Sequence, residues 1–237
     1  MRVIHEKTIY QLTFLPTLFP VNCYLVEESD SLTLIDAALS YSYKKIIKMA
    51  DKIGKPITRI VLTHVHDDHV GALDALKELL PNVIVYVSKR DSRLMSGDVS
   101  LDKGEPDMPI KGSIPKKLKT RADVLVNDGD KIGSLIAIST PGHTPGSFCY
   151  LDTRNKAVIV GDTMQTRGGT AVGGQVRPTF PFPAMATWNK EMTLKSVKKL
   201  MEYEPTLLAA GHGNMIKEPK EAMNRAIIEC EHKLKHA

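Results

Sequence analysis

The order of apolar runs and helical segments along the chain limits the folds that it can adopt. Up to residue 88 short apolar runs alternate with segments of helical periodicity. A second block of strand-like runs begins after residue 121 and is followed by a helical segment, a last apolar run and an amphipathic helix. Two sheets stacked face to face with helices outside satisfy this order, because each sheet can then bury both faces. The sequence therefore predicts an α/β fold, a four-layer αββα sandwich.

The individual elements are predicted from periodicity and from turn residues. Helices are expected from Ser40 or Ser42 to Ile53, from Ala72 to Leu80, from a cap at Thr187 to Pro205, and over residues 218–236. Strands are expected in a first block at 21–26, 32–35, 57–62 and 83–87, in a second block at 124–126, 132–139, 148–151 and 157–160, and last at 207–210.

The segment Lys89–Arg121 lacks periodicity and is punctuated by Gly and Pro. It is predicted to be a long, partly ordered connection, and whether it forms an ordered lid or a flexible loop stays open. A linker between domains is the alternative, although the length of 237 residues suits a single domain over residues 1–237.

Composition narrows the class of protein. With 42% hydrophobic and 25% charged residues the chain is typical of a globular protein, and its net charge of +5 is too small to indicate nucleic acid. Cys23, Cys149 and Cys230 form no C-x-x-C pair, so they predict buried thiols in a reducing compartment. No secretory signal and no membrane-spanning run is recognised, and a cytoplasmic protein is expected.

A cluster of metal-ligand side chains follows the expected strand at 57–62. His64, His66, Asp68 and His69 form the pattern H-x-H-x-D-H where that strand gives way to a loop. Alternation places His64 and His66 on one side of an extended segment, and Asp68 and His69 can face a second point after the chain bends. One motif can therefore supply ligands to two metal ions.

Three further candidate ligands stand just after predicted strands. His143 lies in the turn T-P-G-H-T-P-G-S, Asp162 in G-D and His212 in G-H-G. A catalytic zinc takes about three protein ligands and keeps one position for water, so the first cluster needs partners of this kind.

Taken in order, these motifs resemble the metallo-β-lactamase superfamily of αββα hydrolases, over about residues 22–212. The resemblance implies that His64, His66 and His143 hold one metal, that Asp68, His69 and His212 hold a second, and that Asp162 bridges them. It also implies that Asp36, at the end of the run Leu34-Ile35, supports the metal loop from beneath. The implied cofactors are two divalent ions, zinc first, with iron or manganese as alternatives.

The expected reaction is attack of a metal-bridging hydroxide on the carbonyl of a small ester, a hydroxyacylglutathione-like thioester or a lactone, with Asp68 relaying a proton. An acyl-homoserine-type lactonase is one alternative, disfavoured because Gln165 stands where those enzymes commonly carry tyrosine. A mononuclear iron persulfide dioxygenase using His64, His143 and Asp162 is another. A metal-binding module without catalysis is the third.

Substrate contacts are predicted from the loops beside these ligands. Phe19 lies in an apolar, proline-stiffened segment, while Arg167, Arg177 and Phe182 lie in the loop after Asp162. The arginines are candidates to meet a substrate carboxylate, with solvated surface charge as the alternative. The rings are candidates to contact its apolar part, with a buried edge segment as the alternative for Phe19. The expected partner is a small molecule, with neither nucleic acid nor membrane, and a homo-oligomer stays open.

Overall fold

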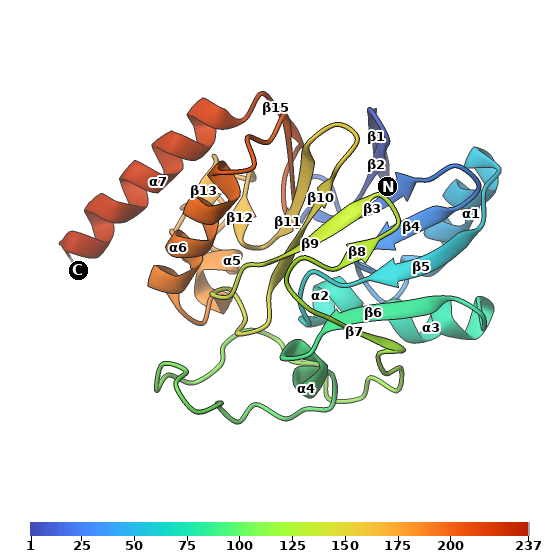
Figure 1. Ribbon diagram of the computed structural model, residues 1–237, viewed down its shortest axis with the longest axis horizontal. Coiled ribbons are helices and arrows are strands. Elements are labelled where there is room, and N and C mark those ends of the chain that lie inside the picture. The colour runs from blue at the N-terminus through green and yellow to red at the C-terminus, as the bar shows by residue number, and fades with distance from the viewer. Residues whose placement is uncertain (237) are drawn as a thin grey trace. The chain divides into compact units, whose positions relative to one another are not determined.

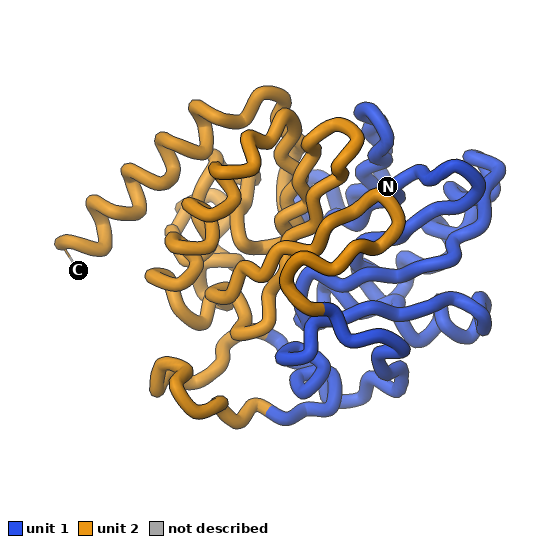
Figure 2. The backbone as a smooth tube through the Cα atoms, in the orientation of Figure 1, with its two compact units in different colours: residues 1–98, 113–126 blue, residues 99–112, 127–237 orange. Residues whose placement is uncertain are grey.

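A computed structural model describes residues 1–236 (Figure 1), and the chain divides into two compact units (Figure 2). Unit 1 consists of residues 1–98 and 113–126, and unit 2 consists of residues 99–112 and the described residues from 127 onward. The single domain expected over residues 1–237 remains a prediction beside this division. Among the described residues no helix has the length and apolar character needed to cross a bilayer.

Unit 1 is built on a seven-stranded sheet whose spatial order equals its order in the chain. The strands are β1 (Arg2–Glu6), β2 (Ile9–Phe14), β3 (Val21–Glu27), β4 (Leu32–Ile35), β5 (Ile57–Val61), β6 (Ile84–Ser88) and β7 (Val124–Val126). The pairs from β1 to β4 are antiparallel hairpins, and β4 to β7 run parallel. Figure 1 shows this sheet coloured from blue to green.

Helices of unit 1 connect its parallel strands. α1 (Tyr43–Ile53) lies between β4 and β5, and α2 (Asp67–Val70) and α3 (Leu73–Leu79) lie between β5 and β6. Because both crossovers step in the same direction and such crossovers are right-handed, α1 and α3 cover the same face of the sheet. α1 buries Ile46, Met49 and Ala50 and ends at Gly54, whose φ of 81° suits the left-handed turn there.

The strand at 124–126 belongs to the first sheet, so its assignment to the second strand block was wrong. β7 pairs with β6 in parallel, with Tyr86 opposite Val124 and Ser88 opposite Val126. Periodicity identifies a strand but not its partner. Because the long segment before β7 contributes no strand, β7 fills the edge that β6 leaves open, and its exposed Val124 and Leu125 fit an edge position.

The segment Lys89–Arg121 forms one short helix, α4 (Asp91–Met95), and is otherwise irregular. Hydrogen bonds hold it in both units. In unit 1 the Asp74 carboxylate accepts from the backbone N–H of Lys119 and of Thr120, and in unit 2 Trp188 Nε1 donates to Met108 O at 2.9 Å. The partly ordered connection therefore has fixed points on each unit.

Unit 2 contains a six-stranded sheet in the order β15-β14-β11-β10-β9-β8 and a separate ribbon of β12 and β13. The strands are β8 (Lys131–Ile132), β9 (Leu135–Ser139), β10 (Phe148–Asp152), β11 (Ala157–Gly161), β12 (Met164–Gln165), β13 (Ala171–Val172), β14 (Leu207–Ala210) and β15 (Ile216–Lys217). The expected strand over 132–139 is therefore a tight hairpin, because Gly133 with φ 59° turns the chain.

The helices of unit 2 are α5 (Phe182–Ala186), α6 (Lys190–Met201) and α7 (Lys220–Lys235). The apolar sides of α6 and α7, including Val197 and Met223, pack in one core cluster with Val160 and Leu208 of the sheet. The cap of α6 is Asn189, whose side chain accepts from Met192 N at 2.9 Å, rather than Thr187 as expected.

Candidate metal centre

The H-x-H-x-D-H cluster lies in unit 1, in the turn between the end of β5 and α2. His64, His66 and His69 are 1%, 3% and 0% exposed. The ring of His64 lies 4.8 Å from that of His66 and 4.1 Å from that of His69, measured between centroids. Asp68 Oδ2 lies 3.9 Å from His69 Nε2, and its side chain is 25% exposed. The structure thus brings these four side chains together.

Asp36 holds this cluster from the end of β4, as the resemblance implied. Its carboxylate accepts from Thr63 N, from Thr63 Oγ1 and from His69 Nδ1, each at 2.8 Å. Its φ of 60° is uncommon for a residue other than glycine, and aspartate is among the few side chains that tolerate it. A buried carboxylate with three hydrogen bonds therefore fixes the loop that carries the histidines.

These hydrogen bonds also set which ring nitrogen of each histidine can bind a metal. Because an ionised carboxylate only accepts, His69 donates from Nδ1–H to Asp36 and keeps its lone pair on Nε2. The Thr63 hydroxyl donates its only proton to Asp36, so it accepts from His64 Nδ1–H at 3.0 Å. Both histidines therefore direct a basic Nε2 away from their supports, the arrangement typical of metal ligands.

A support of the same loop comes from a residue that the sequence analysis missed. Asp91, in α4, is fully buried, and its Oδ2 accepts from Val65 N at 3.0 Å. It lies in the segment without periodicity, where a single buried aspartate gives no sequence signal. Thr63, by contrast, directly precedes His64 and could have been considered as its partner.

The remaining candidate ligands meet in unit 2. β9 and β11 each run antiparallel to β10, and β14 runs parallel to β11, so β9, β11 and β14 end at the same edge of the sheet. His143, Asp162 and His212 follow these three ends. Asp162 Oδ2 lies 3.2 Å from His212 Nε2 and 3.5 Å from His143 Nε2. A carboxylate between two imidazole nitrogens is thereby in place to share a metal with either.

The turn that carries His143 packs against the start of α6. Trp188 N donates to His143 O at 3.0 Å and Asn189 N donates to Gly142 O at 2.9 Å. Gly142 has φ 144°, and a Cβ there would collide with the backbone of Thr193. Glycine is therefore required for this close approach, which fixes the backbone of His143.

Thr187 orients the ring of His143, a role the sequence analysis missed because it placed Thr187 at a helix cap. Thr187 Oγ1 donates to Pro183 O at 2.7 Å and lies 3.0 Å from His143 Nδ1. Because that hydroxyl has only one proton, His143 donates from Nδ1–H and keeps its lone pair on Nε2. This is the nitrogen that faces Asp162.

Phe180 adds a further contact from the loop after Asp162, the loop in which substrate contacts were predicted. Its ring is 1% exposed and lies 5.2 Å from the ring of His212. Gln165 Nε2 donates to Phe180 O at 3.1 Å and to Arg167 O at 2.9 Å, so Gln165 secures this loop. An apolar ring thus covers one side of His212.

The predicted substrate residues have different settings. The guanidinium of Arg177 pairs with both oxygens of Glu229 in α7, at 2.6 and 2.8 Å, which makes it a loop anchor rather than a group directed at a substrate. This pairing, together with Lys233, lowers the pKa of Glu229 to about 2. Phe182 is 49% exposed, and Phe19 of unit 1 and Arg167 of unit 2 are partly exposed.

The donor set fits a divalent transition metal. Imidazole and carboxylate suit zinc, iron and manganese, whereas a cysteine ligand must be a thiolate. Cys23, Cys149 and Cys230 are free thiols, and burial raises the pKa of Cys149 to about 11. The candidate donor groups found among residues 1–236 contain only histidine and aspartate, so cysteine is not among them.

Comparison with known proteins agrees with this geometry. Residues 16–212 match the metallo-beta-lactamase superfamily. The chain is 55% identical over 227 residues to "Uncharacterized protein YobT" of Bacillus subtilis, covering 96% of this chain and 97% of that protein. It is 30% identical over 197 residues to "Glyoxylase B2" of Dictyostelium discoideum, covering 76% of this chain and 61% of that protein.

One of the solved structures that resemble this chain was determined with metal bound. The chain resembles TTHA1623 "in a di-iron-bound form" with a TM-score of 0.67 and 26% identity, covering 90% of this chain and 96% of that one. The expected fold class is confirmed, since the mixed sheets and helices are those of the metallo-β-lactamase fold. With a match over residues 16–212 and a histidine and aspartate donor set, the chain belongs to the metallo-β-lactamase superfamily.

Proposed function

We propose that the chain is a hydrolase of a small ester, thioester or lactone that uses two metal ions. The observation that carries the proposal is the hydrogen bond that each of His64, His69 and His143 makes at Nδ1, from which we infer that each lone pair is on Nε2. A purely structural histidine needs no such control of one nitrogen. Two metals, most simply zinc, are the proposed cofactors.

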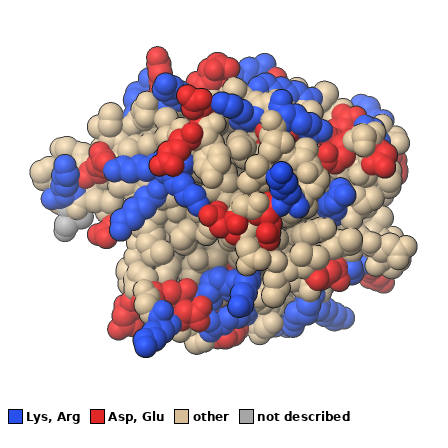
Figure 3. All heavy atoms as spheres, in the orientation of Figure 1, with Lys and Arg blue, Asp and Glu red and all other residues tan. Residues whose placement is uncertain are grey.

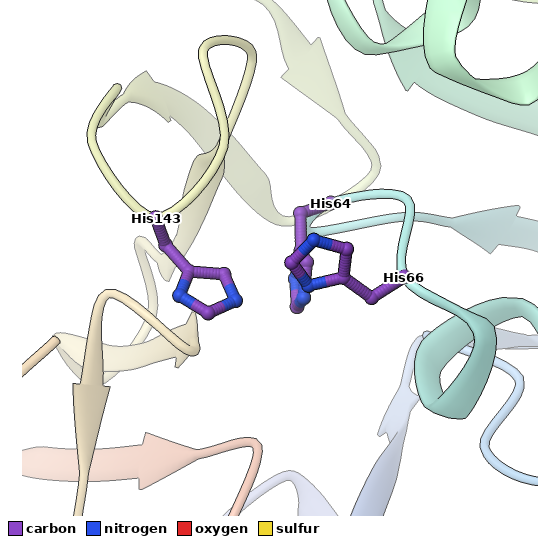
Figure 4. A group of neighbouring side chains, drawn as sticks. All are labelled: His64, His66 and His143. Atoms are coloured by element: carbon purple, nitrogen blue, oxygen red, sulfur yellow. The ribbon is translucent and has the colours of Figure 1, made fainter. Parts of the chain in front are cut away.

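Three donor sets support the proposed pairing of ligands. They are His64, His66 and His143; Asp68, His69 and His212; and His64, His69 and Asp162. Figure 4 draws the first set, with His64 and His66 in the loop after β5 and His143 in the turn between β9 and β10. The first two sets are the proposed ligands of the two metals, and Asp162 is the proposed bridge.

Bound metals would supply a water of lowered pKa and a Lewis acid for the carbonyl oxygen. The residues of the chain would position the reacting groups and exclude bulk water. The partly exposed Asp68 would accept the proton of the attacking water and pass it to the leaving group, which makes it the proposed catalytic residue. Phe180 would keep bulk water from the His212 side of the site.

The proposed substrate is a small molecule with an apolar part. Phe182 and Phe19 offer exposed or partly exposed rings, and Arg167 is the remaining arginine candidate for a substrate carboxylate. Basic and acidic side chains are mixed on the face seen in Figure 3, which fits a small-molecule enzyme better than one that binds nucleic acid. Cytoplasmic location is expected, and oligomerisation is left open.

Metal analysis combined with a substrate panel tests the proposal. Protein reconstituted with zinc, iron or manganese is assayed on lactoylglutathione, an acyl-homoserine lactone and an aryl ester, with Asp162→Ala as the inactive control. Two metals per chain and turnover of one substrate are expected. No turnover with any metal would contradict hydrolysis. A single iron with oxygen consumption on glutathione persulfide would support the dioxygenase instead.

A further inference from the structure

Unit 2 contains a cavity of about 260 Å³ whose lining includes none of the proposed metal ligands. It lies between the first residue of α6, the C-terminal half of α7 and the loop after β13. Gln175, Val176, Lys190, Cys230, Lys233 and Leu234 line it. The volume is slightly below the 300–1,000 Å³ or so of pockets for drug-sized ligands, so a small molecule would fill it.

The cavity carries surplus positive charge. Lys190 Nζ has no hydrogen bond or ion pair within residues 1–236, and Lys190 opens α6, where the helix dipole adds partial positive charge. Lys233 pairs with Glu229 Oε1 at 2.7 Å, but the same carboxylate also serves Arg177. One carboxylate therefore serves two cations, Arg177 and Lys233. Of the other acids nearby, Glu231 pairs with Lys198, and Glu191 is exposed.

Gln175 adds a buried donor that lacks an acceptor. Gln175 is only 4% exposed, and its Oε1 accepts from Val172 N at 2.6 Å. Its Nε2 is buried and has no hydrogen-bond partner among the described residues. An unsatisfied buried N–H is costly, and an acceptor entering from the cavity would relieve that cost.

The rest of the lining is apolar. Val176 and Leu234 contribute aliphatic surface, and the buried Cys230 contributes a thiol whose pKa burial raises, so it stays neutral. A ligand that matches this cavity must combine a hydrogen-bond-accepting anion with a hydrocarbon part. Inorganic phosphate would satisfy the lysines but leave the apolar wall uncovered.

We propose that this cavity is a binding site for a small amphiphilic carboxylate. Its carboxylate would lie between Lys190 and Lys233 and accept from Gln175, and its short hydrocarbon chain would lie against Val176 and Leu234. The proposal is independent of the hydrolase proposed above, since it uses no metal ligand and its test measures binding.

Calorimetric titration of the full-length, metal-loaded protein with hexanoate tests this site. Hexanoate should bind saturably, whereas hexanol and inorganic phosphate should bind at least about tenfold more weakly, because charge-assisted hydrogen bonds and apolar contact are both required. Equal binding of hexanol, or no saturable binding of hexanoate, would overturn the proposal.

Two variants assign the binding to this cavity rather than to the metals. Lys190→Met with Lys233→Met keeps the aliphatic stems and should weaken hexanoate binding by about tenfold or more. Gln175→Glu keeps the acceptor for Val172 N but replaces the donor with a negative oxygen, and should have a similar effect. Lys195→Met, at an exposed site on the same helix, is the matched control and should bind as the native protein does. Native-like binding by both variants would refute the site.

Chemical protection gives a second readout. Cys230 lines the cavity, whereas Cys23 and Cys149 are fully buried and serve as internal controls. Hexanoate should slow alkylation of Cys230 by N-ethylmaleimide, measured by peptide mass spectrometry, and should do so at the concentrations that saturate the calorimetric signal. Binding without any effect on a reactive Cys230 would place the hexanoate elsewhere.

Discussion

The two units hold their candidate metal donors in different ways. In unit 1 the four candidate donors lie within six consecutive residues, after one strand, and the buried Asp36 holds His69 directly and His64 through Thr63. In unit 2 the three donors are single residues spread over 70 positions, each at the end of a different strand. Their geometry is set by the order and direction of the strands. Removing one support should therefore affect several donors in unit 1 but a single donor in unit 2.

The largest effect is expected from Asp162, which contacts the two candidate histidine ligands of unit 2, His143 and His212. Asp162→Ala should lower kcat/KM by about three orders of magnitude or more, because it would remove the proposed bridging carboxylate and with it the proposed activated water. His66→Ala in unit 1 should have an effect of the same size. The measurement is the rate of hydrolysis of the substrate identified in the panel, with Asp107→Ala at an exposed position as the control. A loss below tenfold for Asp162→Ala would contradict the role of the bridge.

Asp36 tests whether one support controls the whole donor cluster of unit 1. Asp36→Asn keeps a side chain that tolerates the left-handed backbone but removes the negative charge that holds His69 and Thr63. Loss of such a partner costs about 10–100-fold in metal affinity. Competition with a chelator measures that affinity, and Asp30→Asn, exposed in the same unit, is the control. Unchanged affinity would show that the loop is held without the charge.

The same contrast explains what the sequence could predict. The motif at residues 64–69, with its strand, is local, so its donors and the support by Asp36 were found from spacing and resemblance. Thr187 and Phe180 act on donors 44 and 32 residues away in the chain, and such distances carry no periodic signal. The partner of β7 and the pairing of Arg177 with Glu229 were missed for the same reason. Tertiary contacts, rather than local propensity, decide each of them.

In unit 2 the counterpart of Asp36 is Thr187, which holds one histidine, His143. Thr187→Val preserves the shape of the side chain but cannot accept from His143 Nδ1. Metal affinity should fall by about tenfold, near the lower end for loss of such a partner. Thr187→Ser retains the hydroxyl and should behave as the native protein. A defect in the serine variant as large as that in the valine variant would assign the effect to packing instead.

The smallest effect is expected from Glu229 of α7, which pairs with Arg177 in the loop after Asp162. The pKa of Glu229 is lowered to about 2, first by its hydrogen bonds to Arg177 and then by Lys233. Its ordinary unfolded value is about 4.3, so the stabilisation is complete above that pH and is lost as the pH falls toward 2. The carboxylate is 37% exposed, so screening keeps the contribution to about 1 kcal/mol or less.

Glu229→Gln should therefore lower the free energy of unfolding by that amount at pH 6, and the difference from the native protein should shrink at pH 3. Urea unfolding at the two pH values measures it, with Glu221→Gln, whose side chain is 88% exposed on the same helix, as the control. A difference that stays constant between the two pH values would assign the stabilisation to packing of the side chain. The loop that places Phe180 beside His212 would then be held by packing. The ion pair between Arg177 and Glu229 would only orient the two side chains.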